Sequence, residues 1–315
     1  MEEAYRPVQP SGEHAFVERL ATRLPAPPPG QTWVGDDAAV VADGIMVATD
    51  VLVAGVHFDL EWMAAPDVGW KALAVNLSDL AAMAAEPIAA VVALVVPPAP
   101  PGVADEVVDG LAEAAEAHGC PLVGGDTSAG PVLTVAVTVV GRVRPGGPVL
   151  RSGARPGDGV FVTGALGAAA CGLRTLLAGG APPDAHRLAL VRPEPRLREG
   201  VAAATAGATA MIDLSDGLAT DLGHVCAASG VGARVDAALL PVAAGAELAD
   251  AVAGGEDYEL CFTAGDPATV SEAFRRAGLE APTPVGEVTD AGDRVLVMPD
   301  GSAEPLRGGW EHGVP

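Results

Sequence analysis

Lysine is almost absent from this sequence, which contains one lysine, Lys71, in 315 residues. The Walker loop GxxxxGK[ST] and the strand lysine of protein kinases both need a lysine in a defined context, and neither motif can be placed. Acidic residues outnumber basic residues by 41 to 18, and the formal net charge at pH 7 is −23. Such a surface repels phosphate backbones and anionic lipid headgroups, so the composition argues against nucleic acid and membranes as partners.

Cysteines, aromatic residues and long apolar runs are also scarce. The four cysteines lie far apart without a CxxC pair, which argues against a disulfide framework or a zinc site. The longest apolar run, residues 88–96, is too short to span a bilayer, and the acidic, polar residues 1–10 do not fit a signal peptide. We therefore expect a cytoplasmic protein with reduced, buried thiols and a core of alanine, valine and leucine.

Strand-like and helix-like segments alternate along the first half of the chain. After a short helix expected at 14–24, apolar runs at 45–53 and 88–97 and alternating valine and threonine at 131–143 predict strands. Helices are predicted at 66–85 and at 101–119, the second ending at a glycine that suits a helix C-cap.

A stretch rich in glycine and proline at 146–156 interrupts this pattern, and we place a domain boundary there, between residues 1–150 and 151–315. The length also favours two domains. The second half repeats the alternation, with strands expected at 160–164, 208–213, 256–263 and 293–298 and helices at 167–179, 194–206 and 216–230. The predicted fold class is α/β (α+β), in two domains of similar size.

Acidic residues recur beside glycines and near the ends of predicted strands. They are Asp36 and Asp37 in GDDAA, Asp50 in ATDV, Asp79 in NLSDL, Asp126 in GGDTSAG, Asp213 and Asp216 in DLSDG, and Glu256 and Asp257 in GGEDYEL. Ligands of open α/β sheets collect at strand ends, and carboxylate oxygens are the ligands that Mg²⁺ prefers. Without a suitable lysine, metal ions held by these acids, with arginines such as Arg151, would have to neutralise the phosphates of ATP.

Simpler interpretations remain open for individual residues. Asp79, Asp126 and Asp213 could each cap a helix, and GDD and GED could be ordinary turns. An EF-hand does not fit residues 213–224, because the glycine falls at the wrong position of the loop. The joint pattern favours a magnesium site, because acids gathered without a cation would repel one another.

Seven segments between residues 34 and 312 resemble, in order, the motifs of the thiamine-monophosphate kinase family: GDDAAV, ATDVLVAGVHF, KALAVNLSDLAAMAAEP, GGDTSAGP, LRSGARPGD, DLSDGLATDLGH and GGEDYELCFT. The resemblance implies the two-domain fold of the aminoimidazole ribonucleotide synthetase superfamily, with N-terminal sheets that form a barrel across a homodimer. It also implies the reaction, in which ATP and thiamine phosphate give thiamine diphosphate and ADP. Several Mg²⁺ ions are the expected cofactors.

The same resemblance implies roles for individual residues. Magnesium is expected at Asp37, Thr49, Asp50, Asp79, Asp126, Asp213 and Asp216, of which Asp79, Asp126 and Asp216 are also expected to be catalytic. ATP contacts are expected at Gly125, Asp126, Arg151 and Ser215. Thiamine phosphate contacts are expected at His57, Glu256 and Trp310, where the indole would face a cationic ring unless it is a terminal hydrophobic plug. Ala48 departs from the family, which often has serine there.

We expect direct in-line transfer of the γ-phosphoryl group without a phosphoenzyme. Two alternatives stay open at this point. The first is another ATP-dependent synthetase of the same superfamily acting on a different acceptor. The second is a protein that binds thiamine phosphate or divalent cations without catalysis.

Overall fold

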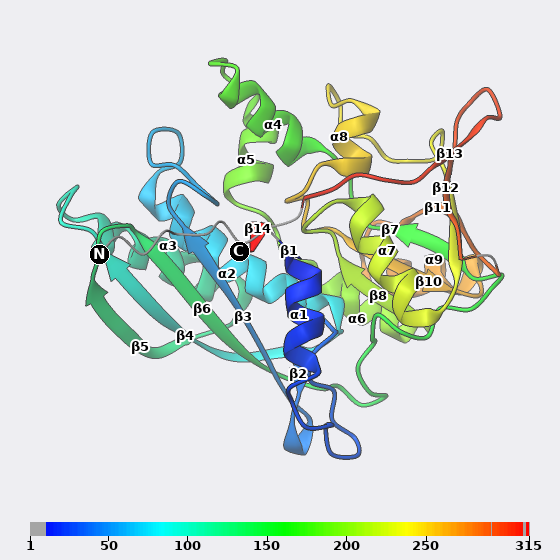
Figure 1. Cartoon of the computed structure of the whole chain (residues 1–315), viewed down its shortest axis with the longest axis horizontal. Coiled ribbons are helices and arrows are strands. Elements are labelled where there is room, and N and C mark those ends of the chain that lie inside the picture. Colours follow the sequence, from blue (N-terminus) through cyan, green and yellow to red (C-terminus); the bar gives the residue numbers. More distant parts are fainter. Residues whose placement is uncertain (1–10, 291, 311–312, 315) are drawn as a thin grey trace, which may run out of the picture.

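The chain folds around two main β-sheets, each with its own helices (Figure 1). The structure, a computed structural model, describes residues 11–290, 292–310 and 313–314. The first sheet has the strand order β2-β3-β6-β4-β5. Its strands are β2 (Ala39–Val40), β3 (Ile45–Val53), β4 (Glu86–Val96), β5 (Leu122–Ala129) and β6 (Thr134–Arg142). Only β4 and β5 run parallel.

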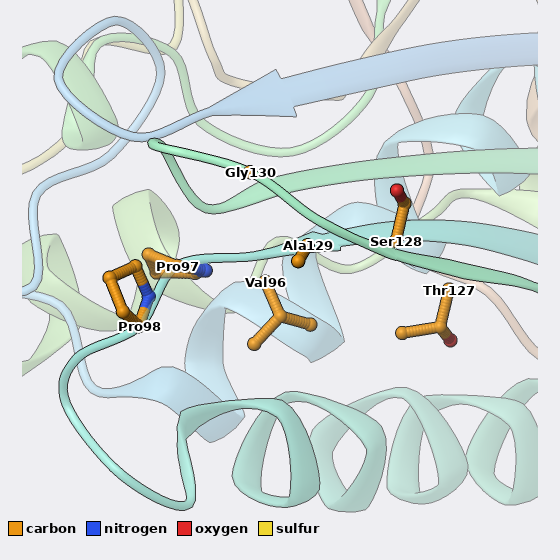
Figure 2. Close-up of a pocket in the computed structure, with 7 residues that line it drawn as sticks. All are labelled: Val96, Pro97, Pro98, Thr127, Ser128, Ala129 and Gly130. Atoms are coloured by element: carbon orange, nitrogen blue, oxygen red, sulfur yellow. The ribbon is translucent and has the colours of Figure 1, made fainter.

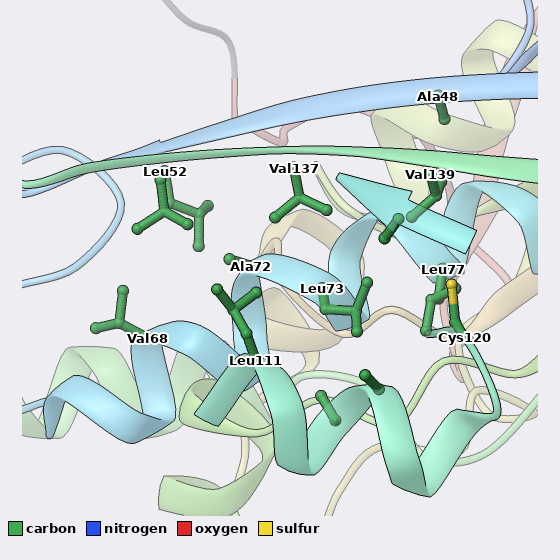
Figure 3. Close-up of a cluster of buried hydrophobic side chains, with 14 of the residues drawn as sticks. Ala48, Leu52, Val68, Ala72, Leu73, Leu77, Leu111, Cys120, Val137 and Val139 are labelled. Atoms are coloured by element: carbon green, nitrogen blue, oxygen red, sulfur yellow. The ribbon is translucent and has the colours of Figure 1, made fainter. Parts of the chain in front are cut away.

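Helices α2 (Ala65–Ala82) and α3 (Val103–His118) cover one face of this sheet. Leu73 and Leu77 of α2 point toward Val137 and Val139 of β6, while Leu111 extends the same core from α3 (Figure 3). The two helices cross at glycines: a Cβ added to Gly110 would lie 1.8 Å from the carbonyl oxygen of Pro66. This close approach fixes α2, and with it the polar residues that α2 carries.

The opposite face of the first sheet carries exposed apolar side chains. Val51 of β3 is 46% exposed, Val91 of β4 is 40% exposed, and Val123 of β5 is 66% exposed. Isolated exposed valines are common, but three on the same face of one sheet form a patch. We call this surface the open face of the first sheet.

The second sheet has seven strands in the order β13-β12-β9-β11-β7-β10-β8. Its strands are β7 (Gly159–Val162), β8 (Ala210–Asp213), β9 (Gly232–Asp236), β10 (Leu260–Ala264), β11 (Thr283–Thr289), β12 (Arg294–Val297) and β13 (Ala303–Pro305). All neighbours are antiparallel except β9 and β12. The helices of this half are α4 (Ala168–Leu177), α5 (Asp184–Val191), α6 (Leu197–Thr205), α7 (Leu218–Ser229), α8 (Leu248–Ala253) and α9 (Pro267–Ala277).

Short elements complete the fold. Helix α1 (Glu13–Ala21) follows β1 (Ser11–Gly12), which pairs with β14 (Gly313–Val314), and a single 3-10 turn, η1 (Ala42–Gly44), precedes β3. None of the helices in the described parts of the chain has the length and apolarity needed to cross a membrane.

The strand and helix predictions for the long periodic segments agree with this structure, and the residues PLV at the start of β5 were recognised as strand-like. The rest of β5, the strands β9 and β11, the short strands β1, β2, β13 and β14, and the helices α5, α8 and α9 were not predicted. The expected strand at 256–263 begins only at Leu260, because residues 254–259 form a loop. Asp50 and Asp126, which we expected beside strand ends, lie inside β3 and β5. The premise that the acids follow strand ends is therefore wrong for these two residues.

Candidate active site

Helix α2 joins the two halves of the chain. Its Ser78 hydroxyl donates to Oδ2 of Asp213 at the end of β8, 2.6 Å away and buried. Its last residues, Ala81 and Ala82, pack into a buried cluster with Phe262 of β10. A Cβ on Gly200 of α6 would lie 2.1 Å from the carbonyl oxygen of Ala81, so α6 approaches α2 closely. Residues that are distant in sequence therefore meet around α2.

Three carboxylates meet beside this helix. Asp37 comes from the loop before β2, Asp79 from α2 and Asp213 from the end of β8, and one carboxylate oxygen of each lies within 4.8 Å of the others. Within the described ranges, this is the single group of three or more histidine, cysteine or acidic side chains close enough to share a metal ion. We call it the acid cluster.

Asp50 of β3 lies next to the acid cluster. Its backbone N–H donates to Oδ1 of Asn76, which is three residues before Asp79 on α2, over 2.9 Å. Burial raises the pKa of Asp79 well above its usual range, and the carboxylates of Asp50, Asp213 and Asp37 raise it further. The expected convergence of Asp50 and Asp79 is present in the structure.

The pKa values of the other two acids of the cluster, Asp213 and Asp37, are also raised. Burial and then Asp37 raise the pKa of Asp213 to about 7, although the hydrogen bond from Ser78 acts against the shift. Burial also raises the pKa of Asp37, despite its ion pair with Arg151. Burial, and for Asp79 and Asp213 also the neighbouring carboxylates, therefore disfavours the charged forms of these three acids.

Arg151 is the cation closest to this charge. Its Nη2 lies 2.6 Å from Oδ1 of Asp37, and its backbone N–H donates to Oδ1 of Asp36 over 3.1 Å. Burial and then Asp37 raise the pKa of Asp36 to about 7. The second oxygen of Asp37, Oδ2, is buried and has no hydrogen-bond partner among the described residues. An unsatisfied buried carboxylate oxygen on a residue that lies close to two further carboxylates fits a hard divalent cation with oxygen ligands, such as Mg²⁺.

Thr49 and Asp126 lie on the other side of the first sheet from the acid cluster. Asp126 pairs in register with Ala93 of β4, which pairs through Ala136 of β6 with Val51 of β3. Residues in one such row point to one face, so Asp126 shares the open face with the exposed Val51. Thr49 lies two residues before Val51 and points to the same face, where its hydroxyl is 2.9 Å from that of Thr138.

Gly125 lies on the edge strand β5, in the same row as Asp50, with two strands between them. Three strand spacings make this separation about 14 Å. A Cβ on Gly125 would lie 1.9 Å from the carbonyl oxygen of Val92, so only glycine fits there. Within a single chain, Gly125 therefore lies well away from the acid cluster.

Two loops of the second half border the acid cluster. Residues 214–217 precede α7 and contain Ser215 and Asp216, and residues 254–259 contain Glu256. The backbone N–H of Glu256 donates to the carbonyl of Ser215 over 2.7 Å, which fastens the loops together. Burial raises the pKa of Tyr258 well above its usual range, and Glu256, Asp50, Asp213 and Asp79 raise it further. Tyr258, itself part of the second loop, therefore lies near the acid cluster.

Two more residues with expected substrate contacts differ in their positions. Trp310 is 55% exposed, and its backbone N–H donates to the carbonyl of Asp216 over 2.9 Å, so its indole is not a buried plug. His57 follows β3, and its Nδ1 accepts a hydrogen bond from the backbone N–H of Val53 over 3.1 Å. This bond leaves the proton of the neutral ring on Nε2.

Sequence reasoning assigned no role to Lys71 or Asp221 and counted Asp36 only among the acids of an expected magnesium site, and the structure places all three here. Lys71 of α2 forms an ion pair with Glu256. Oδ2 of Asp221 in α7 accepts from the backbone N–H groups of Asp216 and Gly217. Asp36 accepts from the backbone of Arg151. Asp221 was visible as a third acid in MIDLSDGLATDLGH, but no periodic signal could pair Lys71 with a residue 185 positions away.

A separate hollow lies at the ends of β4 and β5. Its volume is about 490 Å³, and it is lined by Val96, Pro97, Pro98 and residues 127–130 (Figure 2). Figure 2 shows Val96 and Thr127 on one side of the strands and Ser128 on the other. Its lining is mostly apolar and contains no acidic residue, so it is distinct from the acid cluster.

Comparisons with known proteins find similar sequences along most of the chain. Residues 35–143 match the family described as AIR synthase related protein, N-terminal domain, and residues 155–298 match the corresponding C-terminal domain. The thiamine-monophosphate kinase of Salmonella typhimurium is 43% identical over 250 residues, which cover 74% of this chain and 76% of that protein. The thiamine-monophosphate kinase of Mycobacterium tuberculosis is 38% identical over 321 residues, covering 96% and 92%.

The fold is also similar to a solved structure described as AaThiL complexed with AMPPCP and TMP. The TM-score is 0.83 at 30% identity, and the match covers 96% of this chain and 97% of that one.

Proposed function

The chain belongs to the AIR synthase related proteins and, within them, to the thiamine-monophosphate kinases, and from this premise we propose how its residues carry out the reaction. It is an ATP-dependent phosphotransferase of thiamine biosynthesis that converts thiamine phosphate to thiamine diphosphate. We propose that residues 1–150 are the domain that binds ATP and magnesium and dimerises, and that residues 151–315 are the second domain.

The acid cluster is the observation that carries this proposal. Asp37, Asp79 and Asp213 would hold Mg²⁺, with Asp50 and Asp216 as neighbouring ligands. Bound magnesium would neutralise phosphate oxygens and allow two anionic substrates to approach each other. The chain has a single lysine, and that lysine already pairs with Glu256, so no lysine is available for the triphosphate.

The reaction itself is proposed to be a direct in-line transfer. A phosphate oxygen of thiamine phosphate attacks the γ-phosphorus of ATP while the bond from that phosphorus to the β–γ bridging oxygen breaks. ADP leaves with the bonding electron pair. The acceptor is already anionic near neutral pH, so no side chain has to remove a proton, and the protein contributes positioning and charge. Arg151 and Ser215 would contact ATP, while His57, Glu256 and Trp310 would contact thiamine phosphate.

We further propose a homodimer that uses the open face of the first sheet. The exposed valines of this face support an interface, because burying apolar surface is the main driving force of association. Thr49 and Asp126 lie on the same face, and Gly125 lies on the adjoining edge strand. These three residues would therefore act near the contact between two copies rather than within the acid cluster of their own chain.

The test is product formation by the purified protein. Incubation with ATP, thiamine phosphate and Mg²⁺ should give equal amounts of ADP and thiamine diphosphate, resolved by chromatography. ADP release with another acceptor only would favour a different synthetase, and binding without turnover would favour a binding protein. ATP with a chiral γ-phosphoryl group separates the mechanisms, because direct transfer inverts the configuration at phosphorus and a phosphoenzyme retains it.

A further inference from the structure

We propose that Lys71 is a positioning residue for thiamine phosphate: its ammonium group holds one oxygen of the Glu256 carboxylate and so directs the other toward the substrate. This inference rests on the proposed function, in which Glu256 contacts thiamine phosphate. Nothing in the sequence motifs assigned a role to Lys71.

The contact is short and asymmetrically buried. Nζ of Lys71 lies 2.5 Å from Oε2 of Glu256. The lysine side chain is 0% exposed, whereas the glutamate side chain is 26% exposed. The Lys71 ammonium donates its hydrogen bond to Oε2 of Glu256. The glutamate carboxylate is thus held at one oxygen, while its side chain still reaches solvent.

The backbone around Glu256 is held in an unusual conformation. Glu256 has φ of 69° and Tyr258 has φ of 50°, a region that residues with a Cβ rarely adopt. Backbone hydrogen bonds from Glu256 to Ser215 and from Tyr258 to Leu214 keep the loop in this conformation. The strain is thus located where the Glu256 side chain leaves the backbone, which is typical of functional sites.

Lys71 and the acid cluster belong to the same rigid element. Lys71 precedes Asp79 by eight residues on α2, which is about 12 Å along the helix axis. Helix α2 therefore supports the proposed phosphate end of the substrate through Asp79 and the position of Glu256 through Lys71. An elongated substrate with a phosphate at one end and a cationic thiazolium ring farther along matches this arrangement.

A purely structural role explains the pair less well. Burying a lysine is costly, and apolar residues of similar volume often stabilise a contact as well as a buried ion pair does. The link between the halves also has an independent ion pair on α2, from Asp67 to Arg192. The only lysine of the chain is nevertheless kept, fully buried, beside a residue of the proposed substrate site.

The experiment is steady-state kinetics of the full chain with each substrate varied in turn. The variants are Lys71→Met, Lys71→Gln, Glu256→Gln and the double variant Lys71→Met/Glu256→Gln. The matched control is Arg192→Met, which breaks the ion pair between Arg192 and Asp67 of α2. Lys71→Met should raise the KM for thiamine phosphate about tenfold or more, as expected for the loss of a charged hydrogen bond, and leave the KM for ATP within about twofold.

Lys71→Gln should give a smaller rise, because its amide can still donate to Glu256, and it also serves if Lys71→Met does not fold. The double variant should be no worse than Glu256→Gln alone, because Lys71 acts through Glu256. Arg192→Met should leave both KM values unchanged.

Three results would each overturn the proposal. The first is a double variant whose loss equals the product of the two single losses. The other two, for Lys71→Met, are an equal rise in the KM for ATP, and a lower melting temperature with unchanged KM values. If the wild-type protein forms no thiamine diphosphate, the proposed function fails separately. In that case, isothermal titration calorimetry measures the affinity of the wild-type protein and of Lys71→Met for thiamine phosphate. The proposed role of Lys71 requires that the variant binds more weakly.

Discussion

The carboxylate oxygens of Asp37, Asp79 and Asp213 lie within 4.8 Å of one another in a buried place. Such an arrangement stores electrostatic repulsion that the fold must offset elsewhere, as binding sites often do. Arg151 offsets part of it through Asp37. Function and stability should therefore change in opposite directions when one of these acids is neutralised.

Asp79→Asn tests this opposition at one residue. The variant should lose at least about 100-fold in kcat, comparable to the loss of one electrostatic contact in a site, and melt at a higher temperature than wild type without magnesium. Asp109→Asn on the exposed surface of α3 is the control. A melting temperature of Asp79→Asn below that of wild type would contradict the stored repulsion.

The raised pKa values also predict how the stabilisation by magnesium depends on pH. Asp213 titrates at about 7 in the folded protein and lower when unfolded, so its stability contribution is present at acid pH and lost as the pH rises through about 7. Magnesium competes with protons for these carboxylates, so the rise in melting temperature that it causes should be small at about pH 5 and large at about pH 8. Equal rises at both pH values, measured by differential scanning fluorimetry, would count against a cation in the acid cluster.

Among the elements, α2 and α7 determine where the chemistry is placed. Helix α2 packs on the first sheet and carries Lys71, Asn76, Ser78 and Asp79 toward contacts with other segments. Helix α7 begins at Leu218, directly after the loop that contains Asp216. Asp221, in the first turn of α7, accepts the two backbone N–H groups that define this loop.

Asp221→Ala should therefore loosen the loop that holds Asp216. One buried and one partly buried N–H group would lose their acceptor, which should cost about 1–3 kcal/mol in the free energy of unfolding and also lower kcat. Asp221→Asn keeps an acceptor oxygen and should retain most of the stability. Denaturant unfolding and initial rates measure both effects, and identical behaviour of the two variants would show that the acceptor is not what matters.

Helix α2 was predictable because its apolar residues recur at helical spacing, and Asp213 was predictable because it follows an apolar strand. Strand β5 was hidden because GGDTSAG is rich in glycine and small residues, which local propensity assigns to a turn, while pairing with β4 makes it a strand. The face on which Asp126 lies depends on that pairing register, which the sequence of β5 does not encode. The Lys71 contact was hidden for a similar reason, because its partner comes from the other half of the chain.

At the scale of the whole molecule, the open face of the first sheet should be an interface between copies. Val91→Glu places a charge in this patch and should convert a dimer to a monomer, with a loss of activity, because a buried unpaired charge is costly. Light scattering coupled to size-exclusion chromatography measures the mass. Leu177→Glu on the exposed end of α4 is the control and should stay dimeric; a monomeric wild-type protein would refute the interface.

The two halves should also unfold together. The buried cluster that contains Ala81, Ala82 and Ala84 draws most of its other members from the second half, including Phe161 and Phe262. Shared buried surface couples folding units into one cooperative transition. Circular dichroism and tryptophan fluorescence should therefore give the same midpoint in denaturant, whereas two separated midpoints would indicate independent halves.

The shared cluster also has a consequence during synthesis on the ribosome. The first half can form its sheet early, but the surface of α2 that ends at Ala82 is completed only when Phe274 has been made. At ordinary elongation rates that interval is about 10–40 s. During this interval the nascent chain exposes the apolar surface of α2, which a ribosome-associated chaperone could cover. Until Asp213 has been made, the acid cluster is also incomplete and the chain cannot catalyse the reaction.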